Sequence, residues 1–362
     1  MRIVPIEYAM DHQLAETVFD TNGRMLVRKG SHLTEKLVIN IKSNGIFSVY
    51  INDRFSQNTL NPPISDHIRN ATIMEMIKVC VEARKIEQTG SKMTKALNGH
   101  IDKLMESAKD IMYELDRIES LNINFTDIKS VTTYTYAHPI NVAILSYVLG
   151  RKLGLDTKQK EDLFIGALFE DVGMSFINEN MFMKQGKLDV NEFKKIKLHP
   201  QKGYDFINDF YFANTYVKMI VLQHQEKIDG SGYPNGSKGD KIYQLAKIVS
   251  IADVYDAMTS DRIYARATSS SEAIEYIMGA AGRHFDFDYA KEFVNAIVPY
   301  PVGSLVKMNN GQIALVEKTN HALPLRPVIR LIDPGRRILE KSEVDLTVEK
   351  NLVIESLEYS CP

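Results

Sequence analysis

The stretch TYAHPINVAILSYVLGRKLGL, Thr135–Leu155, decides the fold of the largest part of this chain. It lies in a region, from Val131 to about Val298, in which nearly every apolar run recurs at helical spacing. Loops marked by glycine, proline or asparagine divide this region into about seven helices. In SSSEAIEYI, Ser269 and Glu272 have the spacing of a capping box, which marks a helix start. We therefore predict an all-helical domain here.

Shorter patterns on either side of this region predict two small modules. Asn22-Gly23 separates two apolar runs at hairpin spacing, and a helix-like run and a strand-like run follow. The proline-containing segment after Asp53 is typical of a linker, and apolar residues at helical spacing come next. Asn310-Gly311 marks a second hairpin. The predicted fold is mainly α, with a small α/β N-terminal module at 1–60, a helical linker region at 61–121, the helical domain at 122–298 and a β-rich C-terminal module at 299–362.

The composition is that of a globular protein without a general affinity for nucleic acid. Hydrophobic residues make up 44% of the 362 residues and charged residues 25%, ordinary values for a chain of roughly two or three domains. The net charge of −2 argues against binding of long nucleic acid, while a local pocket for a small phosphate ligand stays open. Cys80 and Cys361 support no disulfide framework or thiolate cluster. Without a recognisable signal peptide or membrane-spanning run, we expect a cytoplasmic protein with no membrane partner.

Side chains that suit metal ions recur along the helical region. They are His138 in TYAHPINVA, Glu170 and Asp171 in ALFEDVG, His199 in LHPQKGYDFI, His224 in LQHQE and Asp253 in IADVYDAMTSDR. Imidazole and carboxylate together suit iron, manganese or another first-row ion, and a bridging Asp171 would hold two ions close together, a pairing that suits phosphodiester hydrolysis. Taken singly, each residue is more often a cap, a surface group or a core residue. His199-Pro200 also suits a helix start, and Asp253 also suits a salt bridge to Arg262.

A glycine-rich loop supplies the second signal. HQEKIDGSGYPNG, residues 224–236, contains three glycines that permit backbone conformations closed to other residues, and Pro234 stiffens the loop. Exposed backbone amides and Tyr233 would line a phosphate or a base, and Arg262 would meet a phosphate with two hydrogen bonds. The alternative is a tight turn between two helices, which glycine spacing alone fits equally well.

Taken in order, these segments resemble the HD-GYP branch of the HD phosphohydrolase superfamily, the metal-dependent phosphodiesterases of cyclic di-GMP. The resemblance covers about 122–298 and rests on TYAHPINVAILSYVLGRKLGL, HPQKGYDFI, DGSGYP and IADVYDAMTSDRIYARA. It implies that the metal ligands include His138, Asp171, His199, His224 and Asp253, with Asp171 bridging. It also implies that Tyr233, Arg262, Gly232 and Pro234 contact the cyclic dinucleotide, and that the dyad Glu170-Asp171 is catalytic.

Three site residues depart from the family pattern. Glu170 stands for the His of the His-Asp dyad, Met174 for the Lys that follows it, and Gln225 for the second of two adjacent histidines. Tyr134 occupies the place where members with a third metal carry Glu, which disfavours a trinuclear centre. The resemblance therefore implies an altered centre for one or two divalent ions.

These departures have unequal consequences for the two expected metal sites. Glu170 still offers an anionic oxygen, so the site it shares with His138, Asp171 and Asp253 should survive and favour Fe²⁺ or Mn²⁺. We expect weak occupancy of the second site, because Gln225 is a neutral and poorer ligand than imidazole. Met174 removes a cation that would oppose phosphate charge, a loss that typically costs on the order of a hundredfold in rate.

Three hypotheses follow for function. The first is a phosphodiesterase that hydrolyses cyclic di-GMP or a related cyclic dinucleotide with reduced activity. The second is an inactive sensor or interaction scaffold that binds the dinucleotide and keeps the DGSGYP loop. The third is a structural partner for other signalling proteins, without metal or ligand. The helices of the linker region would form a homodimer or brace the next domain.

Overall fold

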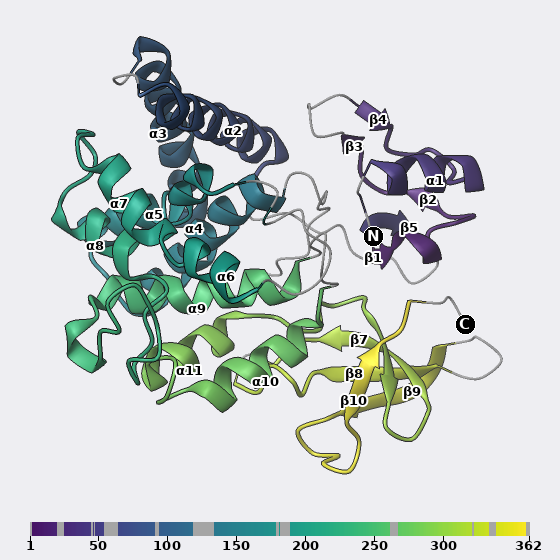
Figure 1. The fold of residues 1–362 in the computed structure, drawn as a ribbon. Coiled ribbons are helices and arrows are strands. Elements are labelled where there is room, and N and C mark those ends of the chain that lie inside the picture. Colours follow the sequence, from purple (N-terminus) through teal and green to yellow (C-terminus); the bar gives the residue numbers. More distant parts are fainter. Residues whose placement is uncertain are drawn as a thin grey trace.

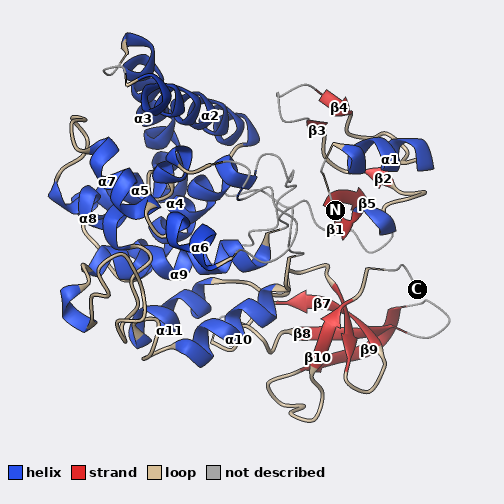
Figure 2. Cartoon of the chain, in the orientation of Figure 1, coloured by secondary structure: helices blue, strands red, loops and turns tan. Residues whose placement is uncertain are grey.

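The computed structural model describes most of the chain as helices with small sheets near both ends (Figures 1 and 2). These elements pack around separate hydrophobic cores. The described residues are 2–19, 25–44, 46, 48–53, 64–90, 94–118, 134–178, 181, 189–260, 267–320, 322–332 and 338–359. Most of the predicted linker after Asp53 therefore lies outside the described residues. The mainly α fold with small sheets toward both ends confirms the predicted fold class. Among the described residues, no helix is both long and apolar enough to span a membrane.

The N-terminal module has the predicted order of strands and helix. Its elements are β1 (Arg2–Pro5), η1 (Ile6–Tyr8), β2 (Gln13–Leu14), β3 (Val18–Phe19), β4 (Met25–Val27), α1 (Glu35–Ser43) and β5 (Ser48–Asn52). β1, β5 and β2 form one antiparallel sheet, and β3 pairs with β4 in a separate ribbon. The Asn22-Gly23 turn that would join β3 to β4 lies outside the described residues. Tyr359 packs on this module, with its ring centroid 5.9 Å from that of Tyr8.

Two long helices, α2 (Asp66–Thr89) and α3 (Lys95–Asp116), pack against each other at one side of the helical domain (Figure 1). The hydroxyl of Thr94 caps α3 by accepting a hydrogen bond from the Leu97 amide at 3.1 Å. Buried residues of both helices, such as Met76 and Leu104, belong to the same hydrophobic cluster as the helices that follow. α2 also contacts α4 and η2, the two elements next to the candidate site.

The helical domain is arranged around α4, whose residues from Ala137 to Gly150 are all buried. A helix that is apolar on every side belongs in the centre of a core, and α4 contacts α5, α9 and α11. The elements of the helical domain are α4 (Tyr134–Lys152), α5 (Thr157–Leu168), η2 (Val172–Phe176), α6 (Val190–Ile196), α7 (His199–Ile207), α8 (Thr215–Gln223), η4 (Gly239–Lys241), α9 (Gln244–Thr259), α10 (Ser270–Ala280) and α11 (Phe287–Ala296). The predicted capping box of Ser269 and Glu272 opens α10.

The C-terminal module is one antiparallel sheet of five strands in the order β10-β6-β7-β8-β9. The strands are β6 (Leu305–Met308), β7 (Ile313–Lys318), β8 (Val328–Ile332), β9 (Ile338–Asp345) and β10 (Ile354–Leu357). β6 and β7 form the predicted hairpin, and Gly311 in its turn has a φ of 83°, which favours glycine.

Candidate metal centre

The six predicted ligand residues converge from five places in the helical domain. His138 lies in α4, Glu170 and Asp171 lie in the turn between α5 and η2, His199 begins α7, His224 caps α8, and Asp253 lies in α9. They form two groups, each with its ligand atoms within 4.8 Å of one another: Asp171, His199 and His224, and His138, Glu170 and Asp253. The two groups are adjacent, because Asp171 Oδ2 of the first lies 4.0 Å from His138 Nε2 of the second.

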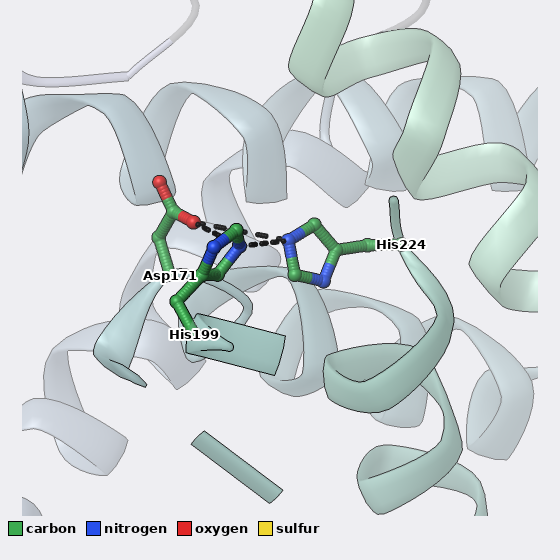
Figure 3. Close-up of side chains that lie close together, drawn as sticks. All are labelled: Asp171, His199 and His224. Carbon is green, nitrogen blue, oxygen red and sulfur yellow. Dashed lines mark hydrogen bonds and ion pairs between the residues drawn. The ribbon is translucent and has the colours of Figure 1, made fainter. Parts of the chain in front are cut away.

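The first group has a hydrogen-bonding conflict that a cation would resolve (Figure 3). The Nδ1 atoms of His199 and His224 each lie 2.8 Å from a backbone carbonyl, those of Ile196 and Val221 respectively. A carbonyl oxygen only accepts, so each Nδ1 carries the hydrogen and each neutral ring has an unprotonated Nε2. These two Nε2 atoms nevertheless face each other at 3.0 Å. Two lone pairs at this distance repel each other unless a cation shares them.

Asp171 completes this group as an anion. Its Oδ1 lies 3.1 Å from His199 Nε2 and 3.7 Å from His224 Nε2. Burial raises the pKa of the Asp171 carboxyl, but His199 and His224 outweigh burial and hold that pKa well below its usual range. Donor atoms that share an ion at about 2.1 Å lie roughly 3 to 3.5 Å apart, and the three distances here run from 3.0 to 3.7 Å.

The second group holds a histidine among carboxylates. His138 Nδ1 lies 2.7 Å from Asp256 Oδ2, and His138 Nε2 lies 3.1 Å from Asp253 Oδ1 and 3.7 Å from Glu170 Oε1. Burial lowers the pKa of His138, but the hydrogen bonds to Asp253 and Asp256 outweigh it and raise the pKa to about 9. The buried carboxylates therefore hold a proton on the ring when no metal ion replaces it.

Glu170 is the carboxyl of this group that the protein leaves without a hydrogen bond among the described residues. Both of its carboxylate oxygens are buried, and neither has a hydrogen-bond partner among the described residues. Burial, together with the charges of Asp253 and Asp171, raises the pKa of Glu170 well above its usual range. A buried polar group without a partner is costly, and a divalent cation beside Glu170 would satisfy it. The donors of both groups, imidazole and carboxylate, therefore fit divalent first-row ions.

Gln225 belongs to a different group from the one the sequence predicted. We expected its substitution to weaken the site of His199 and His224. In the structure its amide Nε2 donates to Asp253 Oδ2 at 2.7 Å, so it contacts the group of His138 instead. The physical reason is that α8 ends at His224, and the chain carries the next side chain toward α9.

The glycine-rich loop lies beside the first group. Buried Glu226 holds its shape, because the carboxylate accepts hydrogen bonds from the amides of Asn235 and Ser237 at 2.8 and 3.0 Å. A Cβ on Gly232 would lie 2.4 Å from the Lys227 nitrogen, so only glycine fits there. The Tyr233 ring lies edge-on to His199, with centroids 6.0 Å apart.

Other residues near the site were missed by the sequence reasoning or fall outside the described residues. Arg262, predicted to contact the ligand, is not among the described residues, and neither is the side chain of Tyr134. The missed residues are Asn141, Asp256 and Lys197. The first two lie three residues after His138 and Asp253, so helical spacing would have placed them on the same faces. Lys197 Nζ lies 5.3 Å from the Tyr233 ring centroid, and no motif marked it.

A model of the HD domain matches residues 101–288, more than half of the chain. The chain belongs to the HD domain family. The match contains all six residues of the two groups and begins within α3, so α2 lies outside it. A model of the KOW domain associated with the HD domain matches residues 305–358, which include the five-stranded sheet.

Several curated proteins are similar to part of this HD domain chain. A cyclic di-GMP phosphodiesterase of Pseudomonas aeruginosa is 33% identical over 59% of this chain and 51% of its own length. The cyclic di-GMP phosphodiesterase PdeB of Borreliella burgdorferi is 28% identical over 59% of this chain and 56% of its own. A 3'3'-cGAMP-specific phosphodiesterase of Vibrio cholerae is 31% identical over 51% of this chain and 34% of its own. The chain thus spans about half the length of the first two relatives.

Among solved structures, an HDG"Y"P protein from Bdellovibrio bacteriovorus matches 81% of this HD domain chain and 98% of its own, with 17% identity and a TM-score of 0.47.

Proposed function

We propose that this chain is a metal-dependent phosphodiesterase that acts on cyclic di-GMP or a related cyclic dinucleotide. The observation that carries the proposal is the pair of Nε2 atoms, of His199 and His224, that face each other at 3.0 Å beside Asp171. The second group, with its unpartnered Glu170, lies next to them. The similarity to phosphodiesterases of cyclic di-GMP and of 3'3'-cGAMP supports the substrate class.

The residues of the two groups would hold one divalent ion each, with Asp171 shared between them. Iron or manganese suits such a mixture of imidazole and carboxylate donors. Bound ions would supply an activated water and positive charge for the phosphoryl oxygens. Gln225 occupies one oxygen of Asp253 with its hydrogen bond, so the group of His138 is the weaker of the two in this proposal.

The chain's own residues would bind and orient the substrate. Burial and the charges of Asp253 and Asp171 raise the pKa of Tyr233 above its usual range, so its phenol stays protonated and is able to donate a hydrogen bond. Gly232 and Pro234 shape the loop that presents it, and Arg262 would pair with a phosphate. Lys197 adds a cation at the Tyr233 ring, whereas Met174 supplies none in its own position.

Metal analysis paired with a hydrolysis assay tests the proposal. The protein is purified without oxygen, its iron and manganese are counted per chain, and cyclic di-GMP and 3'3'-cGAMP are offered at micromolar concentration. We expect one or two ions per chain and release of linear dinucleotide or GMP. Protein that is fully loaded with Mn²⁺ and releases no product from either dinucleotide would overturn the enzymatic function.

A sensor is the second candidate, and the Gln225–Asp253 hydrogen bond favours it. An amide that occupies a carboxylate oxygen of the candidate centre competes with a metal ion for that oxygen. With Met174 in place of a lysine, the chain would bind the dinucleotide and fail to cleave it. Calorimetry with cyclic di-GMP identifies this case as binding without product. Absence of binding at micromolar concentration points instead to a structural partner of other signalling proteins.

Location and assembly form the remaining part of the proposal. We propose a cytoplasmic protein that forms a homodimer through α2 and α3. Exposed Tyr113 on α3 and Val81 on α2 would lie in such an interface. Sedimentation of the purified chain at micromolar concentration tests the dimer, and a monomer would contradict it.

A further inference from the structure

A continuous chain of hydrogen bonds leads from α2 to the candidate metal centre. Arg69 on α2 donates through Nη2 to Asn141 Oδ1 at 2.5 Å, and Asn141 Nδ2 donates to Asp256 Oδ1 at 2.8 Å. The other oxygen of Asp256 lies 2.7 Å from His138 Nδ1. Asn141, Asp256 and His138 are all buried, and Arg69 is partly buried.

The donors and acceptors of these four side chains give the series of hydrogen bonds one direction. A guanidinium only donates, so Arg69 requires the oxygen of the Asn141 amide to point toward it. The amide NH₂ must then point toward Asp256, which accepts it. The second Asp256 oxygen accepts the Nδ1 hydrogen of His138, which leaves Nε2 directed at Asp253 and Glu170. Without Arg69, the Asn141 amide would be free to turn over and present its oxygen to the Asp256 carboxylate.

We propose that Arg69 is a positioning residue for the metal centre, which acts through Asn141 and Asp256 to set the tautomer and orientation of His138. The inference rests on the proposed function, because it assigns His138 to a metal ion. Outer partners of this kind orient ligating histidines, and their removal typically lowers metal affinity about 10- to 100-fold. Arg69 lies on a helix outside the family match of residues 101–288, so this support comes from outside the HD domain.

Other contacts of α2 reach the same centre. Glu87 pairs with Lys202 of α7 at 3.0 Å, and α7 begins with His199. Cys80 forms a hydrogen bond with Ser175 in η2, the element that follows Asp171. α2 therefore contacts two elements that carry or adjoin predicted ligands, α7 and η2, and through Arg69 it also contacts α4, which carries His138.

The test compares Arg69→Met, Arg69→Lys and the control Lys85→Met. Methionine keeps an unbranched apolar stem, and lysine keeps a charged donor. Lys85 lies on the same helix, is exposed and pairs with Glu82 of that helix at 2.7 Å. Metal-free protein is titrated with Mn²⁺, and free Mn²⁺ is measured by electron paramagnetic resonance. We expect about 10-fold weaker binding for Arg69→Met, partial recovery for Arg69→Lys, and no change for Lys85→Met.

A second readout needs no metal ion. In metal-free protein labelled with ¹⁵N-histidine, the Nδ1–H signal of His138 is assigned by its loss in His138→Gln. We expect this signal to broaden or vanish in Arg69→Met and to persist in Arg69→Lys. A persistent, unshifted signal in Arg69→Met overturns the positioning role, whether or not Mn²⁺ binds. If the wild type binds no Mn²⁺ while Arg69→Met loses the signal, the positioning role stands and the metal-dependent function falls.

Discussion

His199 and His224 face each other through their Nε2 atoms at 3.0 Å, although both rings use Nδ1–H in hydrogen bonds to backbone carbonyls. Backbone carbonyls at the end of α6 and in α8 therefore set both tautomers before any ligand arrives. Such a pair is stable only if a proton or a metal ion lies at the Nε2 side. Asp171, the third member of the group, supplies the negative charge that attracts either one.

Removal of one imidazole from this pair should abolish one metal site. For His199→Ala we expect Mn²⁺ affinity at that site to fall on the order of 100-fold, since loss of a direct ligand costs at least as much as loss of its outer partners. Equilibrium dialysis with Mn²⁺ measures this. His32→Ala, which changes an exposed histidine of the N-terminal module, should leave binding unchanged. Equal stoichiometry and affinity in His199→Ala would contradict the ligand assignment.

Glu170→Gln should have opposite effects on metal-free and metal-loaded protein. Glu170 is buried beside Asp171 and Asp253 without a hydrogen-bond partner, so neutralising it relieves repulsion in the metal-free state. We expect the thermal midpoint of chelator-treated protein to rise by about 2–4 °C per 1 kcal/mol relieved. Saturating Mn²⁺ should stabilise the variant less than the wild type, as scanning calorimetry will show. A lower thermal midpoint of Glu170→Gln than of the wild type in chelator would contradict the proposed repulsion at Glu170.

The Cys80 thiol should react slowly while the protein is folded. Burial raises its pKa to about 11 from the usual 9.0, although the hydrogen bond to Ser175 acts in the opposite direction. Because the thiolate is the nucleophile, two pKa units leave about 100-fold less of it at pH 8. In Cys361→Ser, iodoacetamide should therefore modify Cys80 at least about 100-fold faster in denaturant than in buffer, and the folded rate should rise toward pH 11. Equal rates of Cys80 modification in denaturant and in buffer at pH 8 would contradict the protection of this thiol by folding.

Gly232→Ala should distort the loop that carries Tyr233. The new Cβ would lie 2.4 to 2.6 Å from backbone atoms of Gln225, Glu226 and Lys227, which cannot move aside cheaply. We expect a loss of about 1–3 kcal/mol in the free energy of unfolding and weaker binding of cyclic di-GMP. Gly279→Ala is the matched control, because Gly279 is exposed in α10 and no described atom lies within 4 Å of its Cβ position, and it should stabilise by up to about 1 kcal/mol. Denaturant titration measures the free energy of unfolding of both variants.

Restoring the family residues should raise hydrolysis. The triple variant Glu170→His, Met174→Lys, Gln225→His returns two imidazoles and the missing cation, and the lysine alone is worth on the order of 100-fold in rate. Gln225→His should act mainly on the group of His138, because residue 225 contacts Asp253. Product release from cyclic di-GMP is followed at equal metal loading. No gain in a fully loaded triple variant would show that the scaffold has lost catalysis elsewhere.

Local patterns were sufficient to predict the elements on which the site is built. Helical periodicity predicted α4 and the helices after it, the Ser269–Glu272 capping box predicted the start of α10, and Asn310-Gly311 predicted the β6–β7 hairpin. These signals depend on neighbours within a few residues, so the sequence displays them directly. The ligand types were equally visible, because a histidine or a carboxylate keeps its chemistry in any fold.

The partners of those ligands were decided only by the tertiary structure. Gln225 follows His224 in sequence, yet its amide contacts Asp253 rather than the group of its neighbour. The bond from Arg69 to Asn141 joins residues that are 72 positions apart. The sequence by itself determined which residue types and helices this protein has. Helix packing determined which side chains share a site, because contact across distant segments depends on how buried faces fit together and leaves no periodic trace in the chain.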